Sequence, residues 1–176
     1  MLTFGIDLGT ANSTIALFDG HIPQLIPNSY NETIIPSKVI LLQDGRFFCG
    51  RDAAIHTERF EAHNFTVGSI KRQLHNCSGF VFEGKRYYPQ IISAMILAQL
   101  KKQAEDYLKM RIDEAVICIP CNFGVVQRYA TLEAAEMAGI KVLRMLNEAS
   151  AAALAFSYLI DTCKSNRNTI YWFHET

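Results

Sequence analysis

The chain has 176 residues, enough for one well-packed core, and its 49% hydrophobic and 19% charged residues are typical of a globular domain. Its 17 basic side chains are balanced by 17 acidic ones, so charge gives no reason to expect nucleic acid or an anionic membrane as a partner. No apolar run is long enough to span a bilayer.

The N-terminus and the cysteines bear on where the protein works. The chain enters an apolar segment at once, without a basic region or a cleavage site, and its five cysteines are irregularly spaced. Both features predict a cytoplasmic protein with reduced thiols. Cys118 and Cys121 have the spacing of a metal or redox pair. However, Cys118 falls in a predicted buried strand and no second pair exists, so we favour a structural role.

The first predicted element is a β-hairpin. Residues 3–8 form an apolar strand, and residues 15–18 belong to the return strand. Gly9 and Asn12 tolerate positive φ, which predicts a tight turn between the strands. Such a turn directs successive backbone N–H groups to one side and forms a nest for an anion.

Two side chains at this turn suggest what the anion is. Asp7 precedes the turn, and Thr10 places a hydroxyl inside it. A carboxylate beside an anion nest requires a cation between them, and phosphate with Mg²⁺ meets that requirement with few protein carboxylates. An ordinary surface hairpin is the alternative for the Gly-Thr-Ala-Asn turn taken alone.

The segment around the turn has a family resemblance. Residues 5–10, Gly-Ile-Asp-Leu-Gly-Thr, resemble the first phosphate loop of the actin, sugar-kinase and heat-shock-70 superfamily. The following Asn12-Ser13 looks most like the heat-shock-70 (DnaK-like) chaperones. Ala11 departs from the pattern, in which a second Thr or Ser is usual. The change removes a hydroxyl but no backbone N–H, so we expect phosphate binding to survive it.

The resemblance implies a nucleotide site at this turn. The expected ligands are ATP or ADP with Mg²⁺, and K⁺ is a further candidate ion. Asp7 is expected to reach Mg²⁺ through water, and Thr10, whose hydroxyl lies in the turn, is expected to be a catalytic residue. The nucleotide-binding residues that the resemblance implies here are Gly9, Thr10, Ala11 and Asn12.

The next predicted elements are a short strand, a second hairpin and a short helix. They cover residues 24–28, 33–50 and 52–59, and Asp44-Gly45 forms the turn of the hairpin. Ile35-Pro36-Ser37 is similar to a turn found in the same family. These elements carry no chemistry of their own.

A basic pair follows at Lys71 and Arg72. Taken alone, such a pair on a loop or short helix is most often a solvated surface. The family, however, has an apolar residue followed by Lys and Arg at this place, and its lysine contacts the γ-phosphate and the attacking water. The resemblance therefore implies a catalytic and nucleotide-binding role for Lys71 and a structural role for Arg72.

A hairpin and a long helix come next. Residues 78–88 predict two short strands around Glu83-Gly84, and Pro89 stands where helices accept proline, in the first turn. The helix is expected over residues 90–110. Its apolar stripe recurs every four residues, which predicts a core helix. The stripe is Ile92, Ile96, Leu100, Ala104 and Leu108.

The remaining pattern alternates strands and helices. Residues 115–119 predict a buried strand that Pro120 ends, and Asn122 is the expected cap of a helix reaching residue 138. Residues 141–146 predict another strand, and an alanine-rich helix is expected from Glu148 to about Tyr158. This βαβ order is typical of an α/β fold with helices on the sheet.

This stretch resembles the heat-shock-70 pattern almost position by position, which the actins and sugar kinases do not. Pro120 matches the proline proposed to switch the domain between nucleotide states, and Arg128 matches its relay arginine. Glu148 matches the carboxylate beside the metal and the hydrolytic water. Without the family, Glu148 would be interpreted as a helix cap favoured by the helix dipole. The resemblance covers residues 3 to about 160.

Two departures fall near the proposed relay. The family usually has Asn-Glu-Pro-Thr where residues 147–150 are Asn-Glu-Ala-Ser, and it commonly has Asn-Asp-x-Gln-Arg where residues 124–128 are Gly-Val-Val-Gln-Arg. We expect these changes to blunt coupling without preventing nucleotide binding.

The end of the chain is the largest departure. Residues 161–168 predict a polar linker, and residues 169–173 predict the strand that leads to a second phosphate loop in the family. The chain ends at Thr176 without that loop. We therefore expect a polypeptide that is truncated before the second lobe and that does not turn over ATP alone.

The fold class expected is α/β: one lobe of the actin-like (ribonuclease H-like) ATPase fold, with a mixed sheet and covering helices. Residues 1–160 are expected to form this lobe, with an inserted subdomain near 38–110, and residues 161–176 the linker and the start of a second lobe. The function implied is that of an ATP-binding chaperone lobe. Its complete form would work with unfolded polypeptide, a J-domain co-chaperone and a nucleotide-exchange factor, without nucleic acid or membrane. A non-catalytic fragment that binds another protein is the alternative.

Overall fold

Three sheets and four α-helices make up the part of the chain that the computed structural model describes, residues 2–59 and 64–165. The helices are α1 Gly50–Arg59, the short 3₁₀ helix η1 Ile70–Gln73, α2 Pro89–Leu108, α3 Val125–Met137 and α4 Glu148–Ser165. The strands are β1 Thr3–Asp7, β2 Asn12–Phe18, β3 Gln24–Leu25, β4 Ile35–Pro36, β5 Lys38–Leu41, β6 Phe47–Cys49, β7 Phe65–Gly68, β8 Phe80–Phe82, β9 Lys85–Tyr87, β10 Glu114–Ile119 and β11 Lys141–Asn147.

The main sheet is mixed, as expected. Its order is β11-β10-β1-β2-β3, and β4 also pairs with β2. Strands β1, β10 and β11 are parallel, whereas β1 and β2 form the antiparallel hairpin. The register places Asp7 beside Cys118 and Ile119 beside Asn147. The carboxyl ends of three parallel strands therefore meet at one edge, where α/β sheets bind ligands.

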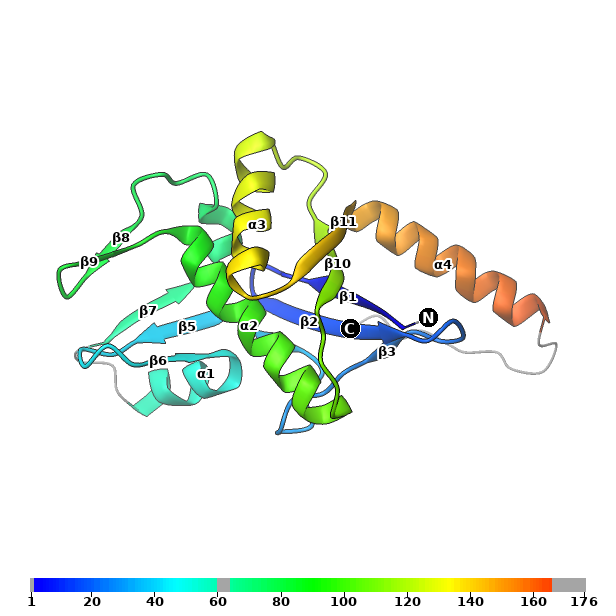
Figure 1. The fold of residues 1–176 in the computed structure, drawn as a ribbon, viewed down its shortest axis with the longest axis horizontal. Coiled ribbons are helices and arrows are strands. Elements are labelled where there is room, and N and C mark those ends of the chain that lie inside the picture. The colour runs from blue at the N-terminus through cyan, green and yellow to red at the C-terminus, as the bar shows by residue number, and fades with distance from the viewer. Residues whose placement is uncertain (1, 60–63, 166–176) are drawn as a thin grey trace.

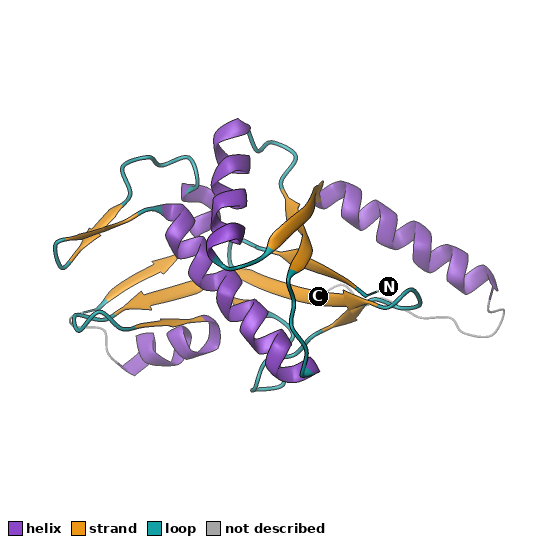
Figure 2. Cartoon of the chain, viewed as in Figure 1, coloured by secondary structure: helices purple, strands orange, loops and turns teal. Residues whose placement is uncertain are grey.

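Helix α2 joins the main sheet to the smaller ones. It lies across strands of both (Figures 1 and 2) and contacts β2, β5, β6, η1 and α3. Four residues of its predicted stripe are buried, and Leu108 packs against their edge. Burying each aliphatic side chain stabilises the fold by about 1.5–3 kcal/mol, so this stripe accounts for much of the core. The fully buried Ile6 and Ile117 complete it from the sheet side.

Along the chain, the strands of the two smaller sheets come after β4 and before α2. Strand β5 pairs with β6 and β7, and α1 packs against β5 and β6. Strands β8 and β9 form the predicted hairpin around Glu83 and Gly84. The ring of Phe65 in β7 contacts the rings of Phe80 and Phe82, at centroid distances of 5.9 and 5.6 Å. This contact holds the hairpin on the smaller sheet.

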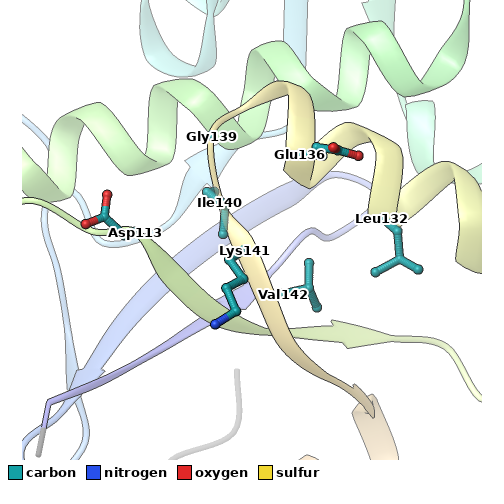
Figure 3. A pocket seen from close by; sticks show the side chains of 7 residues that line it. All are labelled: Asp113, Leu132, Glu136, Gly139, Ile140, Lys141 and Val142. Carbon is teal, nitrogen blue, oxygen red and sulfur yellow. The ribbon is translucent and has the colours of Figure 1, made fainter.

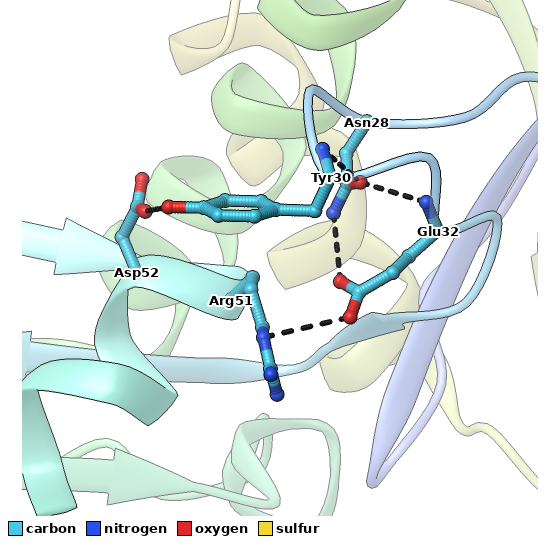
Figure 4. A network of polar contacts seen from close by, with 5 residues as sticks. All are labelled: Asn28, Tyr30, Glu32, Arg51 and Asp52. Carbon is cyan, nitrogen blue, oxygen red and sulfur yellow. Dashed lines mark hydrogen bonds and ion pairs between the residues drawn. The ribbon is translucent and has the colours of Figure 1, made fainter.

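A polar network ties the loop before β4 to α1 (Figure 4). The Asn28 side chain accepts the N–H groups of Tyr30 and Glu32 at 2.9 Å and donates to the Glu32 carboxylate at 3.0 Å. Arg51 lies 3.5 Å from the other Glu32 oxygen, and the Tyr30 hydroxyl donates to Asp52 at 2.7 Å. The network fixes the chain just before it crosses between the sheets.

The structure differs from the sequence predictions at two helix ends. Asn122 does not cap α3, whose N-cap is Gly124, because the Phe123 N–H donates to the Pro120 carbonyl and closes a separate turn first. Helix α4 continues past Tyr158 to Ser165, so the predicted linker at 161–165 is helical, since no Gly or Pro interrupts it. The predicted strand at 169–173 lies outside the described residues.

A further difference concerns the strand predicted within residues 33–42. It is two strands, β4 in the main sheet and β5 in the smaller one, and Ser37 lies between them. Within the described ranges, no helix combines the length and the apolar character that a membrane crossing requires.

Candidate functional site

The turn between β1 and β2 is held by close backbone packing. A Cβ on Gly9 would lie 1.9 Å from the Asn12 carbonyl oxygen, so only glycine fits there. The turn does not use the tolerance of Gly9 and Asn12 for positive φ, because neither is among the positive-φ residues of the described chain. Glycine is needed at this position for close approach and not for its backbone freedom.

Two buried serines brace this turn. The Gly9 N–H donates to Ser13 Oγ at 3.2 Å, and Ser13 Oγ lies 2.7 Å from Ser37 Oγ. The Ser37 N–H donates to the Ala11 carbonyl at 2.8 Å. The Ile-Pro-Ser segment noted in the sequence thus supports the turn from behind. Sequence reasoning had assigned Ser13 and Ser37 no such role.

The bracing decides which amides of the turn face outward. The Gly9 N–H is already bonded to Ser13. Asn12 faces Pro36 in the register of β2 and β4, but the bond at this pair runs from the Ser37 N–H to the Ala11 carbonyl, so the pairing does not engage the Asn12 N–H. Within the described residues, the N–H groups of Thr10 and Ala11 have no protein acceptor. These two amides are therefore available to an anion.

Lys71 lies between two carboxylates that come from different elements. Its Nζ donates a hydrogen bond to Glu148 Oε1 and lies 3.9 Å from Asp7 Oδ1. Lys71 is carried by η1, Asp7 ends β1, and Glu148 begins α4 directly after β11. Lys71 and Glu148, which are 77 positions apart in the chain, thus meet at the carboxyl edge of the sheet.

The three charged side chains differ in how far they are buried. The Lys71 side chain is only 7% exposed, whereas those of Asp7 and Glu148 are 51% and 42% exposed. A buried ammonium is stable only when it is paired, and both carboxylates serve this purpose here. The neighbouring Arg72 is exposed. The structure therefore buries Lys71 between the two carboxylates and leaves Arg72 exposed, although both residues line the same pocket.

The surroundings of Asp7 alter its acidity. Partial burial raises the pKa of Asp7 above its usual 3.8, the Lys71 ammonium counteracts this, and the Glu148 carboxylate adds to it. The adjacent Cys118 is affected in the same way. Its pKa is raised by burial and then by the Asp7 and Glu148 carboxylates. These effects favour the neutral thiol of Cys118 at the edge of the site, and the thiolate is the reactive form of cysteine.

A pocket of about 280 Å³ adjoins these charges. Thr10, Lys71 and Pro120 line it, so it brings together three residues that the sequence predicted separately. The other lining residues come from η1 and the turn after it, from the turn after β10 and from α3. They are Arg72, His75, Asn122, Phe123 and Gln127. Sequence reasoning assigned Arg72, Asn122 and Gln127 no place in the pocket, and no motif marked His75 or Phe123, because the pocket joins separate segments.

Arg128 is connected to this pocket through the backbone. Its Nε donates to the Phe123 carbonyl at 3.0 Å, and the Phe123 N–H donates to the Pro120 carbonyl at 3.2 Å. Arg128 therefore fixes the turn that starts at Pro120. It does not enter the group formed by Lys71, Asp7 and Glu148.

The charged residues suit a hard divalent cation. Asp7 and Glu148 offer half-exposed carboxylate oxygens, which Mg²⁺ prefers, and Lys71 partly compensates their charge. Within residues 2–59 and 64–165, no group of three or more His, Cys, Asp or Glu side chains forms a metal cage. Mg²⁺ needs no such cage, because it commonly uses one or two carboxylates with waters and phosphate oxygens.

A larger hollow of about 490 Å³ lies at the start of β11, between Asp113, Glu136 and Lys141 (Figure 3). Lys141 lies 3.6 Å from Glu114, so its charge is already compensated. None of the residues that line this hollow belongs to the group around Lys71. We assign it no part in the site.

The fold and the position of the site define the class of protein. A mixed sheet with covering helices, a phosphate-type turn after β1 and charged residues at the carboxyl edge are features of a lobe of the actin-like ATPase fold. The family model described as Hsp70 protein matches residues 3–80 and 75–172. The chain belongs to the Hsp70 family. It is thus related to the ATP-binding lobe of chaperones that act on polypeptides.

Proposed function

We propose that this chain holds the phosphates of ATP with Mg²⁺ as the first lobe of an Hsp70-type nucleotide-binding domain. Residues 1–160 would form that lobe, with the inserted subdomain near 38–110, and residues 161–176 would lead to the second. The observation that carries the proposal is the position of Lys71. A nearly buried ammonium lies between Asp7 and Glu148 and lines the same pocket as Thr10.

Each residue would have a distinct task. The N–H groups of Thr10 and Ala11 would bind phosphate oxygens, and Gly9, bonded to Ser13, would keep the turn in shape. Lys71 would exchange part of its pairing with Glu148 for the transferring phosphate and so neutralise developing charge. Glu148 would orient the attacking water. Bound Mg²⁺ supplies further charge neutralisation at the phosphates, and Asp7 would hold it through water.

Pro120 and Arg128 would transmit the state of the site. Pro120 lines the pocket, and Arg128 is bonded to the turn that starts there. A displacement of Pro120 would therefore reach α3 through Phe123 and Arg128. In the complete cycle this movement would be coupled to the binding of unfolded polypeptide in the cytoplasm. A J-domain co-chaperone and a nucleotide-exchange factor would act in the same cycle.

Hydrolysis in a two-lobed protein tests the proposal. Residues 1–165 joined to the second lobe of a related Hsp70 should hydrolyse ATP, and Lys71→Ala or Glu148→Gln should lower the rate at least about tenfold. Lys101→Ala is the matched control, because Lys101 is also largely buried and lies 3.9 Å from a glutamate, but on α2. If Lys71→Ala and Lys101→Ala have the same rate as the parent, the assignment of Lys71 to chemistry is wrong.

The exposed part of α4 supports a second candidate, a non-catalytic module that binds another protein. Leu154 and Phe156 are 61% and 66% exposed, and no charged residue occurs between Glu148 and Asp161. Large exposed apolar patches mark interaction surfaces. The two candidates differ in their response to nucleotide. A melting temperature that rises with Mg-ATP supports the nucleotide-binding lobe, whereas an unchanged value favours the module.

A further inference from the structure

A groove runs beside α3 on the side away from the Lys71 pocket. Two hollows of about 370 and 460 Å³ make it up, and both are lined by Tyr88, Gln90 and Glu133. Helix α3 packs on α2, whose first turn follows Tyr88 (Figure 1). With 13 residues, α3 gives the groove a length of about 20 Å, at about 1.5 Å per residue.

Apolar side chains lie along this groove although water can reach them. Val125, Val126 and Tyr129 are 69%, 53% and 64% exposed, and all three line one of the two hollows. Met137, at the other end of α3, is 54% exposed and lines the second. Exposed apolar side chains therefore occur at both ends of α3.

The charge of the groove has one sign. The charged residues among those lining the two hollows are Glu133 and Glu136, both exposed and three residues apart on α3. In the described ranges, neither has a basic partner within ion-pair distance. An apolar strip beside two uncompensated carboxylates complements a ligand that is apolar on one side and basic on the next.

We propose that this groove binds a basic amphipathic polypeptide helix. Its apolar side chains would cover Val125, Tyr129 and Met137, and its Lys or Arg side chains would pair with Glu133 and Glu136. A groove beside a helix, about four turns long, fits the helix-in-groove mode of peptide recognition. A few apolar anchors buried there dominate the binding energy and offset the cost of association.

Fluorescence anisotropy with a labelled peptide tests the proposal on the intact chain. The probe is a peptide of about 14 residues, made of Leu and Lys spaced to give one apolar face. We expect saturable binding that Val125→Asp weakens about tenfold. Aspartate at the first helical position suits the helix dipole, so this variant should fold. Val81→Asp is the matched control, because Val81 is similarly exposed, at 59%, on β8 and lines neither hollow.

A charge exchange tests the polar half of the proposal. Glu133→Lys with Glu136→Lys should weaken binding of the Leu-Lys peptide about tenfold and create binding of a matched Leu-Glu peptide. Asp106→Lys with Glu83→Lys, two exposed positions that line neither hollow, makes the same change of net charge and is the control. The proposal is overturned if the peptide does not saturate, or if Val125→Asp binds it as well as Val81→Asp does. It is also overturned if sedimentation shows that the free chain is a dimer and that Val125→Asp makes it a monomer.

Discussion

Replacing Lys71 separates the two contributions that this residue makes to stability. Its ammonium is paired with Asp7 and Glu148, and its alkyl stem is buried, since the side chain is only 7% exposed. At the 3.9 Å between Lys71 and Asp7, the attraction is about 1 kcal/mol at the dielectric constant of water and about 4 kcal/mol at an effective value of 20. Removing the charge from the interior returns several kcal/mol of desolvation cost.

The two electrostatic effects of Lys71 therefore nearly cancel, and the stem decides the outcome. Lys71→Met keeps a buried unbranched stem, so the free energy of unfolding at pH 7 should fall by no more than about 1 kcal/mol. Lys71→Ala also leaves a cavity, which should cost about 2–3 kcal/mol. For a chain of this size, these losses correspond to no more than about 2–4 °C and to about 4–12 °C in melting temperature.

The assay is urea unfolding followed by circular dichroism, at pH 7 and again at pH 4.5. Without the ammonium, the Asp7 and Glu148 carboxylates repel each other, so the loss in both variants should shrink at the lower pH. Equal losses for Met and Ala would refute the assignment of stability to the buried stem. A loss that stays the same at both pH values would refute the electrostatic part.

Three further predictions concern the neighbours of Lys71. Gly9→Ala should lower the melting temperature by several degrees, because its Cβ would lie 1.9 Å from a carbonyl oxygen, and thermal unfolding by circular dichroism measures this. Asp7→Asn should slightly raise the free energy of unfolding of the free chain at pH 7. Because folding raises the pKa of the Asp7 carboxyl, the stability of the parent falls as the pH rises above 3.8. A gain in the variant that persisted at pH 3 would contradict this. Iodoacetamide should label the exposed Cys77 and Cys121 well before Cys118, as read by peptide mass spectrometry, and Asp7→Asn should speed the labelling of Cys118, since its carboxylate helps to raise that thiol's pKa.

The periodic and the local features could be predicted from the sequence. The stripe of α2 from Ile92 to Ala104 is buried, and the hairpin of β8 and β9 turns at Glu83 and Gly84. Hydrophobic period and turn chemistry are properties of neighbouring residues, so a single sequence contains them. The presence of a phosphate-type turn after β1 was predicted for the same reason.

The contacts between distant segments could not be predicted in this way. Ser37 supports the turn from 24 positions away from Ser13, and neither serine has a neighbour in sequence that suggests the contact. Lys71 and Arg72 look alike in sequence, and only the packing of η1 buries one and exposes the other. The start of α3 was misplaced because a backbone turn at Pro120 competes with the predicted cap.

The most direct test of the proposed phosphate site is an amide-resolved titration. In two-dimensional nitrogen–proton spectra of the isotope-labelled chain, Mg²⁺ with pyrophosphate should shift the Thr10 and Ala11 amides most. The Gly9 amide should shift less, because it is already bonded to Ser13. Lys71→Met should weaken the response without moving it elsewhere. Saturable shifts centred away from this turn, or no shifts at all, would contradict the assignment of phosphate binding to the β1–β2 turn.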